Sequence, residues 1–407
     1  MKKTLFCLAF SLMMPCVVQA QVEENTDNAL FRSAIEFFDK GETAQALEIF
    51  NGLIKRNPEN HNVMYEIALC NYRLTEYDKA IAILKKLKKA DPNPRVFTLY
   101  GNCLDDKGKL KDALAMYDDG IKLFPGNGHL HLEKGVIYMK SKNYDDAYAC
   151  FKAGINAQPS FASNYFRVAQ LVIESKKPYF GIVCAEVHSL LSPASERSNV
   201  LSEWMYDAYQ SNVKYQGDSV AVLLENTFNI NPLAVFADIT NTVNEMAFVS
   251  CYINAAKGCY EPLKTNGKLS LKDVVEFRKR ILDEYNNPME HSDDSAPEGY
   301  DGEDADSILI YGDAEDADSV VAVGDELSEK DKKEMDAISK KPVNTIFGKL
   351  MKYQTEILEA GHWEAYNMWL FRNGNVEEFK AWLADNDEKF KSFSAWYDKH
   401  KFTFDAE

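Results

Sequence analysis

The chain has 407 residues, with 46 lysines and arginines against 63 aspartates and glutamates, and a formal net charge of −17 at pH 7. This length is typical of two or three domains. Sixteen of the acidic residues and a single lysine lie between residues 290 and 331, so the negative charge belongs to one segment and the rest of the chain is nearly balanced. We therefore expect no nucleic-acid partner, because phosphate binding needs concentrated positive charge.

The first twenty residues have the pattern of a secretory signal peptide. Two lysines follow Met1, an apolar run extends from Leu5 to Val18, and Val18 and Ala20 place small residues at the −3 and −1 positions of a cleavage site before Gln21. The run is too short for a membrane-spanning helix, which takes about 20 residues. We expect residues 1–20 to be removed and the mature protein to be exported, to the periplasm or outside the cell.

Two other stretches bear on the membrane. Cys16 could carry a lipid anchor, but Pro15 stands where a small residue is expected. The apolar stretch from Pro232 to Ile253 is interrupted by Asp238 and Glu245. We therefore predict neither a lipid anchor nor a membrane span.

Residues 27–195 repeat one pattern five times. A proline recurs in steps of 34, 33, 34 and 34 residues, and a small residue lies twelve positions before each one. A period of this length with these marks predicts an array of helix–turn–helix units. The marks are the small residues Ala46, Ala80, Ala113, Ala147 and Gly181, the prolines Pro58, Pro92, Pro125, Pro159 and Pro193, the first-half small residues Ala34, Ala68, Gly101, Gly135 and Ala169, and the large apolar residues Phe50, Leu84, Tyr117 and Phe151.

This array resembles the tetratricopeptide repeat family. The units fall at 27–60, 61–93, 94–127, 128–161 and 162–195, about 170 of the 407 residues. The resemblance implies an all-α solenoid in which the first helix of each unit lines a concave groove that holds a peptide or protein segment. Carried over by repeat position, the groove residues are Tyr65, Leu69, Tyr72, Thr98, Asn102, Leu132, Val136, Met139, Phe166 and Gln170. The alternative is that the flanking region packs into this groove and fills it.

A subset of the family clamps the C-terminal carboxylate of its ligand with paired asparagine and basic residues. Only Asn102 matches that pattern here. The equivalent positions of the other units are Ile35, Leu69, Val136 and Gln170. We therefore do not expect a clamp of this kind.

Six cysteines remain beyond the predicted signal peptide. Cys70 and Cys103 occupy one position of neighbouring units, and Cys150 and Cys184 occupy another. Equivalent positions on stacked helices lie about 9–10 Å apart, so we interpret these four as buried apolar residues. Cys251 and Cys259 differ, because eight residues of one helix span about 12 Å and a disulfide needs Cα atoms within about 7 Å. A Cys251–Cys259 bridge therefore requires the helix to end between them, which Gly258 allows. In an oxidising compartment this bridge and two free thiols are both open alternatives.

Beyond the array the period is lost, but helical spacing continues. Residues 196–287 are predicted to be helices that cap the apolar face of the last unit. Residues 288–340 are too polar and acidic to bury a core, and we predict a disordered acidic linker with at most short strands at Ile308–Tyr311 and Val320–Val323. Residues 341–407 hold four of the five tryptophans and predict helices over Val343–Ala360, Trp363–Arg372, Val376–Ala384 and Glu388–His400.

The linker contains Asp-Ala-Asp-Ser twice, at residues 304–307 and 316–319. Paired carboxylates can contribute to a calcium loop. The motif lacks the glycine and the closing glutamate of a helix–loop–helix calcium site, so a solvated acidic linker is the favoured interpretation.

The chain shows no pattern of a known catalytic site. Its seven histidines form no HExxH motif, and neither a GxSxG element nor a glycine-rich phosphate loop occurs. We predict a non-catalytic protein without a cofactor or metal, acting as a protein–protein interaction scaffold or adaptor in the cell envelope.

Two alternatives stay open. A module that captures glycan or peptide would need exposed rings, such as Trp363 or Trp369. A hydrolase would need a cleft among the non-repeat helices with a perturbed side chain, for instance His362 near Glu364.

Overall fold

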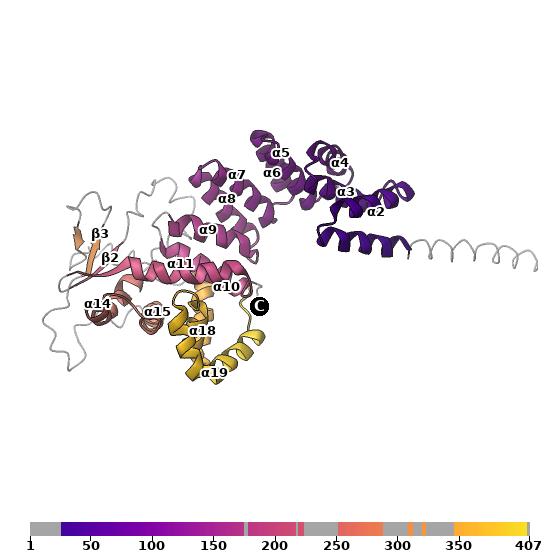
Figure 1. Cartoon of the computed structure of the whole chain (residues 1–407). Helices are drawn as coiled ribbons and strands as arrows, with labels where there is room; N and C mark the ends of the chain where they lie inside the picture. Colours follow the sequence, from indigo (N-terminus) through magenta and orange to yellow (C-terminus); the bar gives the residue numbers. More distant parts are fainter. Residues whose placement is uncertain are drawn as a thin grey trace, which may run out of the picture. The chain divides into compact units, whose positions relative to one another are not determined.

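The computed structural model describes residues 26–174, 178–216, 219–223, 251–287, 308–311, 320–322 and 346–404. The predicted signal peptide, the duplicated acidic motif and most of the predicted linker lie outside these ranges. The chain divides into two compact units, and the boundary along the sequence lies between Gln158 and Pro159. Figure 1 colours them along the sequence.

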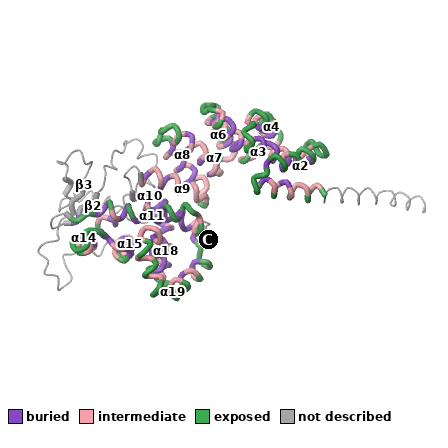
Figure 2. Tube along the Cα trace, in the orientation of Figure 1, coloured by how far each residue is buried: buried purple, intermediate pink, exposed green. Residues whose placement is uncertain are grey.

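The first unit is a series of helix pairs. The pairs are residues 26–39 with α2 (Thr43–Arg56), α3 (His61–Arg73) with α4 (Tyr77–Ala90), α5 (Pro94–Asp106) with α6 (Leu110–Leu123), and α7 (Gly128–Lys140) with α8 (Tyr144–Ala157). Buried and exposed residues alternate along each helix (Figure 2), as expected for helices that pack by one face. The predicted helix–turn–helix solenoid is confirmed.

An asparagine N-cap begins the second, third and fourth helix pairs. Asn60, Asn93 and Asn127 precede α3, α5 and α7, and each side chain accepts a hydrogen bond from the backbone N–H three residues on, at 3.1, 3.3 and 3.1 Å. Such a cap contributes about 1 kcal/mol. The caps recur at the repeat period, so the sequence sets the start of α3, α5 and α7 in the same way.

The turn inside each pair places one residue in the left-handed backbone region. The residues are Gly41, Thr75, Gly108 and Lys142, with φ of 84°, 61°, 73° and 60°. Glycine adopts this conformation without strain, whereas a β-branched residue such as threonine does so at a cost. The second pair therefore carries strain that the first and third do not.

The core of each pair joins a small residue of the first helix to a large one of the second. Phe50, Leu84, Tyr117 and Phe151 are at most 1% exposed. At Gly135 an added Cβ would lie 2.4 Å from the ring of Phe151, which is closer than packed atoms allow. The marked positions in the sequence are thus the places where two helices approach each other most closely.

The second unit begins with the fifth helix pair, α9 (Ala162–Glu174) and α10 (Pro178–Leu191). It continues with α11 (Glu196–Asn212), a helix at residues 251–256, η1 (Lys257–Cys259), α14 (Tyr260–Asn266), α15 (Leu271–Asn286), α17 (Ile346–Glu359), α18 (Trp363–Leu370) and α19 (Val376–Lys399). Every residue of α10 from 181 to 190 is buried. A helix buried around its whole circumference lies inside a core, and α10 is that central helix.

Two details of the later helices follow from their sequence. Ser270 and Asp273 form a capping box at the start of α15, as their spacing predicts. α19 is kinked at Asn386, where φ is −130° and ψ is 26°. The Asn386 Nδ2 donates to the Trp382 carbonyl at 2.9 Å. The helices predicted on either side of residue 386 are therefore the two parts of α19, joined at this kink.

Four short strands form a small sheet in the order β1-β2-β3-β4. β1 (Val213–Gln216) and β2 (Ser219–Leu223) are antiparallel, β2 is parallel to β3 (Ile308–Tyr311), and β3 is antiparallel to β4 (Val320–Ala322). Val220 pairs with Ile308. Strands were expected at 308–311 and 320–323, and β3 and β4 occupy 308–311 and 320–322 within this sheet. The strands β1 and β2 were not predicted from the sequence.

Candidate functional site

The predicted groove residues of the first unit lie on α3, α5 and α7. Thr98 and Leu132 are buried, with 8% and 9% of their surface exposed. The other six are half-buried, and we call them the array face: Tyr65, Leu69, Tyr72, Asn102, Val136 and Met139. Side chains of this kind pack against the array by one edge and keep another accessible to a ligand.

A cation is held on an aromatic ring at one end of this face. The Arg95 guanidinium lies over the Tyr65 ring, with Cζ 4.1 Å from the centroid, and its Nη2 donates to Glu66 Oε1 at 3.0 Å. Burial raises the pKa of both Tyr65 and Glu66, and Arg95 opposes each shift. The Arg95 side chain is 64% exposed. It is therefore positioned by its neighbours while remaining accessible.

At the other end, polar contacts join the first helices of consecutive pairs. The Tyr72 hydroxyl donates to Asp106 Oδ2 at 2.7 Å, which links α3 to α5. Lys140 Nζ donates to Asp105 Oδ2 at 2.7 Å, which links α5 to α7. Burial and then the bond to Asp106 raise the pKa of Tyr72, so Tyr72 stays a neutral donor. These charge-assisted bonds fix the spacing of the helices that carry the array face.

Asn102 lies between these two ends, and a residue of the second helix of its pair fixes its orientation. Tyr117 of α6 is 1% exposed, and its hydroxyl donates to Asn102 Oδ1. Burial raises the pKa of Tyr117, which keeps it a donor. With Tyr117 bound at its amide oxygen, Asn102 can donate to a ligand from its amide nitrogen. A backbone carbonyl of a bound segment is a suitable acceptor for it.

The fifth pair differs from the others. Phe166 of α9 stacks on Trp204 of α11 with ring centroids 6.1 Å apart, and the Arg197 guanidinium lies 4.9 Å from the same ring. Gln170 accepts a hydrogen bond from Arg167 at 2.9 Å. The flanking helix α11 thus packs on Phe166, as the internal-packing alternative predicts for this pair. The array face is accordingly defined by residues of the first unit alone.

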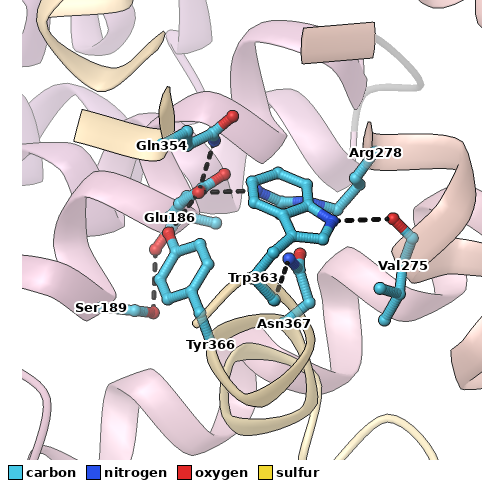
Figure 3. A network of polar contacts seen from close by, with 9 residues as sticks. Glu186, Ser189, Val275, Arg278, Gln354, Trp363, Tyr366 and Asn367 are labelled. Carbon is cyan, nitrogen blue, oxygen red and sulfur yellow. Dashed lines mark hydrogen bonds and ion pairs between the residues drawn. The ribbon is translucent and has the colours of Figure 1, made fainter. Parts of the chain in front are cut away.

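A second cluster of polar residues lies inside the second unit and was not predicted from the sequence (Figure 3). Glu186 of α10 accepts at Oε1 from Arg278 Nη2 and Gln354 Nε2, each at 2.7 Å, and from the Tyr366 hydroxyl. Burial lowers the pKa of Arg278, but the charge and hydrogen bond of Glu186 together with the neighbouring Tyr209 and Tyr366 raise it by more, and the net shift is upward. The cluster joins α10, α15, α17 and α18. Glu186 and Arg278 are each 3% exposed in their side chains, so we assign the cluster to the core.

A family model for the tetratricopeptide repeat matches residues 37–103 and 106–171. The repeats within residues 37–171 are tetratricopeptide repeats. Tetratricopeptide repeats are protein–protein interaction scaffolds that bind protein partners and are generally non-catalytic.

The curated relatives match about a third of this chain. A TPR repeat-containing protein of Methanocaldococcus jannaschii is 26% identical over 147 residues, covering 36% of this chain and 26% of that protein. A BBSome complex member of Bos taurus is 24% identical over 115 residues, covering 28% of this chain and 22% of the relative. The matched stretch thus spans about a quarter of these relatives. A solved structure, a thermophilic TPR protein of Thermus thermophilus, has 18% identity and a TM-score of 0.38, covering 44% of this chain and 98% of that one.

The two cysteines of the possible disulfide lie in the second unit. Cys251 and Cys259 are both buried free thiols, so the bridge left open by the sequence is not formed in this structure. The physical reason is that the backbone does not turn between them. The helix at 251–256 runs directly into η1, and both Ala256 and Tyr260 have right-handed helical φ and ψ.

The two alternative functions required specific surroundings for their residues. Trp363 is 5% exposed, and its Nε1 donates to the Val275 carbonyl at 3.2 Å. Its ring is therefore too buried to stack on a glycan. His362 lies against the Phe393 and Trp396 rings. Glu364 accepts instead from Trp382 and Lys389, and the structure does not bring the histidine and this carboxylate together as a pair.

Membrane-spanning helices and metal-ligand clusters are both lacking from the residues that the structure describes. None of the helices within those residues has the length and apolar character needed to cross a membrane. Within the same ranges, no three histidine, cysteine, aspartate or glutamate side chains are grouped as ligands for a metal ion.

Proposed function

We propose that the array face binds an extended or helical segment of a partner protein, and that the chain is a non-catalytic scaffold or adaptor of the cell envelope. The observation that carries this proposal is the contrast between equivalent positions. Tyr65 and Phe166 occupy equivalent repeat positions, and both are half-buried. Arg95, a residue of the repeats, lies over the Tyr65 ring, whereas Trp204 of a flanking helix stacks on Phe166. A flanking helix thus packs on the groove position of the fifth pair, and the proposal rests on the groove positions of the first unit.

The chemistry of the array face suits a segment with apolar side chains and an accessible backbone. Tyr65, Tyr72 and Met139 offer aromatic and thioether surface, of the kind enriched where proteins bind one another. The Asn102 amide nitrogen and the exposed Arg95 add donors for carbonyl or carboxylate oxygens. The contacts between consecutive helices hold these groups in place before binding, which lowers the entropic cost of association.

Capture from an envelope extract of the source organism tests this proposal. The wild type is compared with a variant carrying Tyr65→Ala, Tyr72→Ala and Met139→Ala. The matched control carries Leu110→Ala, Leu123→Ala and Tyr144→Ala, three residues of the second helices that are 41%, 59% and 54% exposed. Circular dichroism establishes that all three proteins are folded.

The proposal predicts that a specific protein is held by the wild type and the control and lost by the array-face variant. Titration of the purified partner should then show an affinity at least about tenfold weaker for the array-face variant, since truncated aromatic anchors at an interface often cost 2 kcal/mol or more, roughly thirtyfold. Equal capture by all three proteins would remove the array face as the binding site.

Export is the second part of the proposal and rests on the sequence of residues 1–20. Mass spectrometry of the protein purified from an envelope fraction should find its first residue at Gln21. Protein that is confined to the cytoplasm and retains Met1 would contradict an envelope role.

A further inference from the structure

Residues 401–404 follow α19 as a segment that is neither helix nor strand. Their side chains alternate between the inside and the outside of the unit. Phe402 is 5% exposed and Phe404 is half-buried, whereas Lys401 and Thr403 are exposed. A period of two residues is the geometry of an extended chain lying on a surface.

The surface beneath this segment presents aromatic rings from α9 and α17. Tyr165 of α9 stacks on Phe404, with centroids 6.1 Å apart and 10° between the ring planes. Tyr353 of α17 meets Phe402 edge-on at 5.4 Å. Tyr165 is fully buried and Tyr353 is 6% exposed, so the segment covers rings that belong to the core of the unit.

The backbone of the segment is held as well. Tyr353 donates from its hydroxyl to the His400 carbonyl at 2.8 Å, and Lys349 Nζ donates to the Phe404 carbonyl at 3.1 Å. The surface thus provides a hydrogen bond at each end of a five-residue stretch and a ring for each of two alternate side chains. Main-chain hydrogen bonds combined with sites for alternate side chains are how proteins recognise extended peptides.

We propose that Tyr165, Lys349 and Tyr353 form a binding site for an extended aromatic-x-aromatic segment, and that residues 401–404 of a second copy of this chain can occupy it in trans. The chain's own segment fills the site in cis. Because it follows α19 directly, its effective concentration is far above that of any free segment. The intact chain is therefore closed to a ligand from outside, and the site opens when Phe402 and Phe404 are lost or displaced.

The test uses the full chain with Phe402→Ala and Phe404→Ala, and a fluorescent peptide with the sequence of residues 398–407. Fluorescence anisotropy should show saturable binding to this variant, at least about tenfold tighter than to the intact chain. Adding Lys349→Ala, or making the two alanine substitutions in the peptide, should weaken binding by a similar factor. The matched control chain carries Lys401→Ala and Thr403→Ala, whose side chains face outward, and should stay as closed as the wild type.

Three results would overturn the proposal: no saturable binding, equal binding by the intact and doubly substituted chains, or equal binding of the two peptides. If the doubly substituted chain is poorly folded, its melting temperature is measured with an excess of either peptide. The proposal predicts that the unsubstituted peptide raises the melting temperature and the substituted one does not. A melting temperature that is indifferent to both peptides would also overturn it.

Discussion

Gly101 and Tyr117 occupy adjoining space in the third helix pair, where an added Cβ on Gly101 would lie 2.4 Å from Cε1 and Cζ of the tyrosine ring. The same ring carries the hydroxyl that donates to Asn102, the neighbour of the glycine. One close contact thus accounts for a mark in the sequence, for the packing of α5 on α6, and for the orientation of an amide on the array face.

Gly101→Ala should therefore destabilise the first unit. The overpacked ring costs about 1–3 kcal/mol, which exceeds the gain of about 1 kcal/mol from placing alanine in a helix. The matched control is Gly52→Ala in α2, where nothing lies within 4 Å of the added Cβ. That substitution should stabilise the unit by about 0.5–1 kcal/mol.

Urea unfolding followed by circular dichroism measures both variants. All five tryptophans lie beyond residue 158, so their fluorescence does not report directly on the first unit. Gly101→Ala and Gly52→Ala shifting the midpoint in the same direction would contradict the packing argument.

Thr75→Gly should stabilise the second helix pair. Thr75 has a φ of 61°, a conformation that costs a non-glycine residue about 1–2 kcal/mol, partly offset by the greater flexibility of glycine in the unfolded chain. The reciprocal change, Gly108→Ala at the equivalent turn with φ of 73°, should destabilise the third pair. Opposite shifts of the urea midpoint are expected, and a fall for Thr75→Gly would count against the strain at this turn.

The repeat region could be predicted in detail because its signals are local. The spacing of Phe50, Leu84, Tyr117 and Phe151 located the core of each pair, and all four are buried. Gly41 and Gly108 lie at two of the turns, where glycine is the residue type that this backbone conformation favours. Thr75 and Lys142 occupy the same left-handed position without any residue type that would reveal it.

The second unit was less predictable because its contacts join distant segments. Glu186 and Gln354 are 168 residues apart in sequence, and β2 pairs with β3, which lies inside the predicted linker. No local sequence period predicts contacts between segments so far apart. For the same reason the sequence leaves packing of the flanking region on the groove as an alternative without naming Trp204, since the repeat position of Phe166 matches that of Tyr65.

Glu186→Gln should destabilise the second unit strongly. The substitution leaves the buried Arg278 guanidinium without its carboxylate, and breaking a buried ion pair from one side costs about 3–5 kcal/mol. The control is Lys389→Ala, which removes a pair with Glu364 whose side chains are 62% and 46% exposed and should cost about 0–1 kcal/mol. Tryptophan fluorescence in urea reports both. Similar midpoints for the two variants would show that the cluster in Figure 3 contributes no more than a surface pair.

His188 should make the second unit sensitive to acid. It is 2% exposed, and its Nδ1 and Nε2 lie 2.9 Å from the Ala162 carbonyl and 3.3 Å from Ser195 Oγ. Burial lowers the pKa of His188 below its usual value of 6.5. The unfolded chain therefore takes up this proton first as the pH falls, so the stability that His188 contributes is present above pH 6.5 and is lost below it.

A His188→Gln variant isolates that contribution. The difference in unfolding free energy between wild type and variant should be constant above about pH 7. Below about pH 6.5 it should shift against the wild type, by no more than about 1.4 kcal/mol per pH unit. A difference that is independent of pH down to about 5 would mean that His188 does not titrate differently in the folded protein.

Site-specific photocrosslinking in living cells tests the central claim, that the array face holds a partner, most directly. A photoreactive phenylalanine analogue replaces Tyr72 or Met139 on the array face, or Tyr144 on the second helix of the fourth pair, which is 54% exposed. The proposed function predicts that Tyr72 and Met139 yield an adduct with the same protein and that Tyr144 yields none. Adducts from Tyr144 alone, or the same adduct from all three positions, would contradict it.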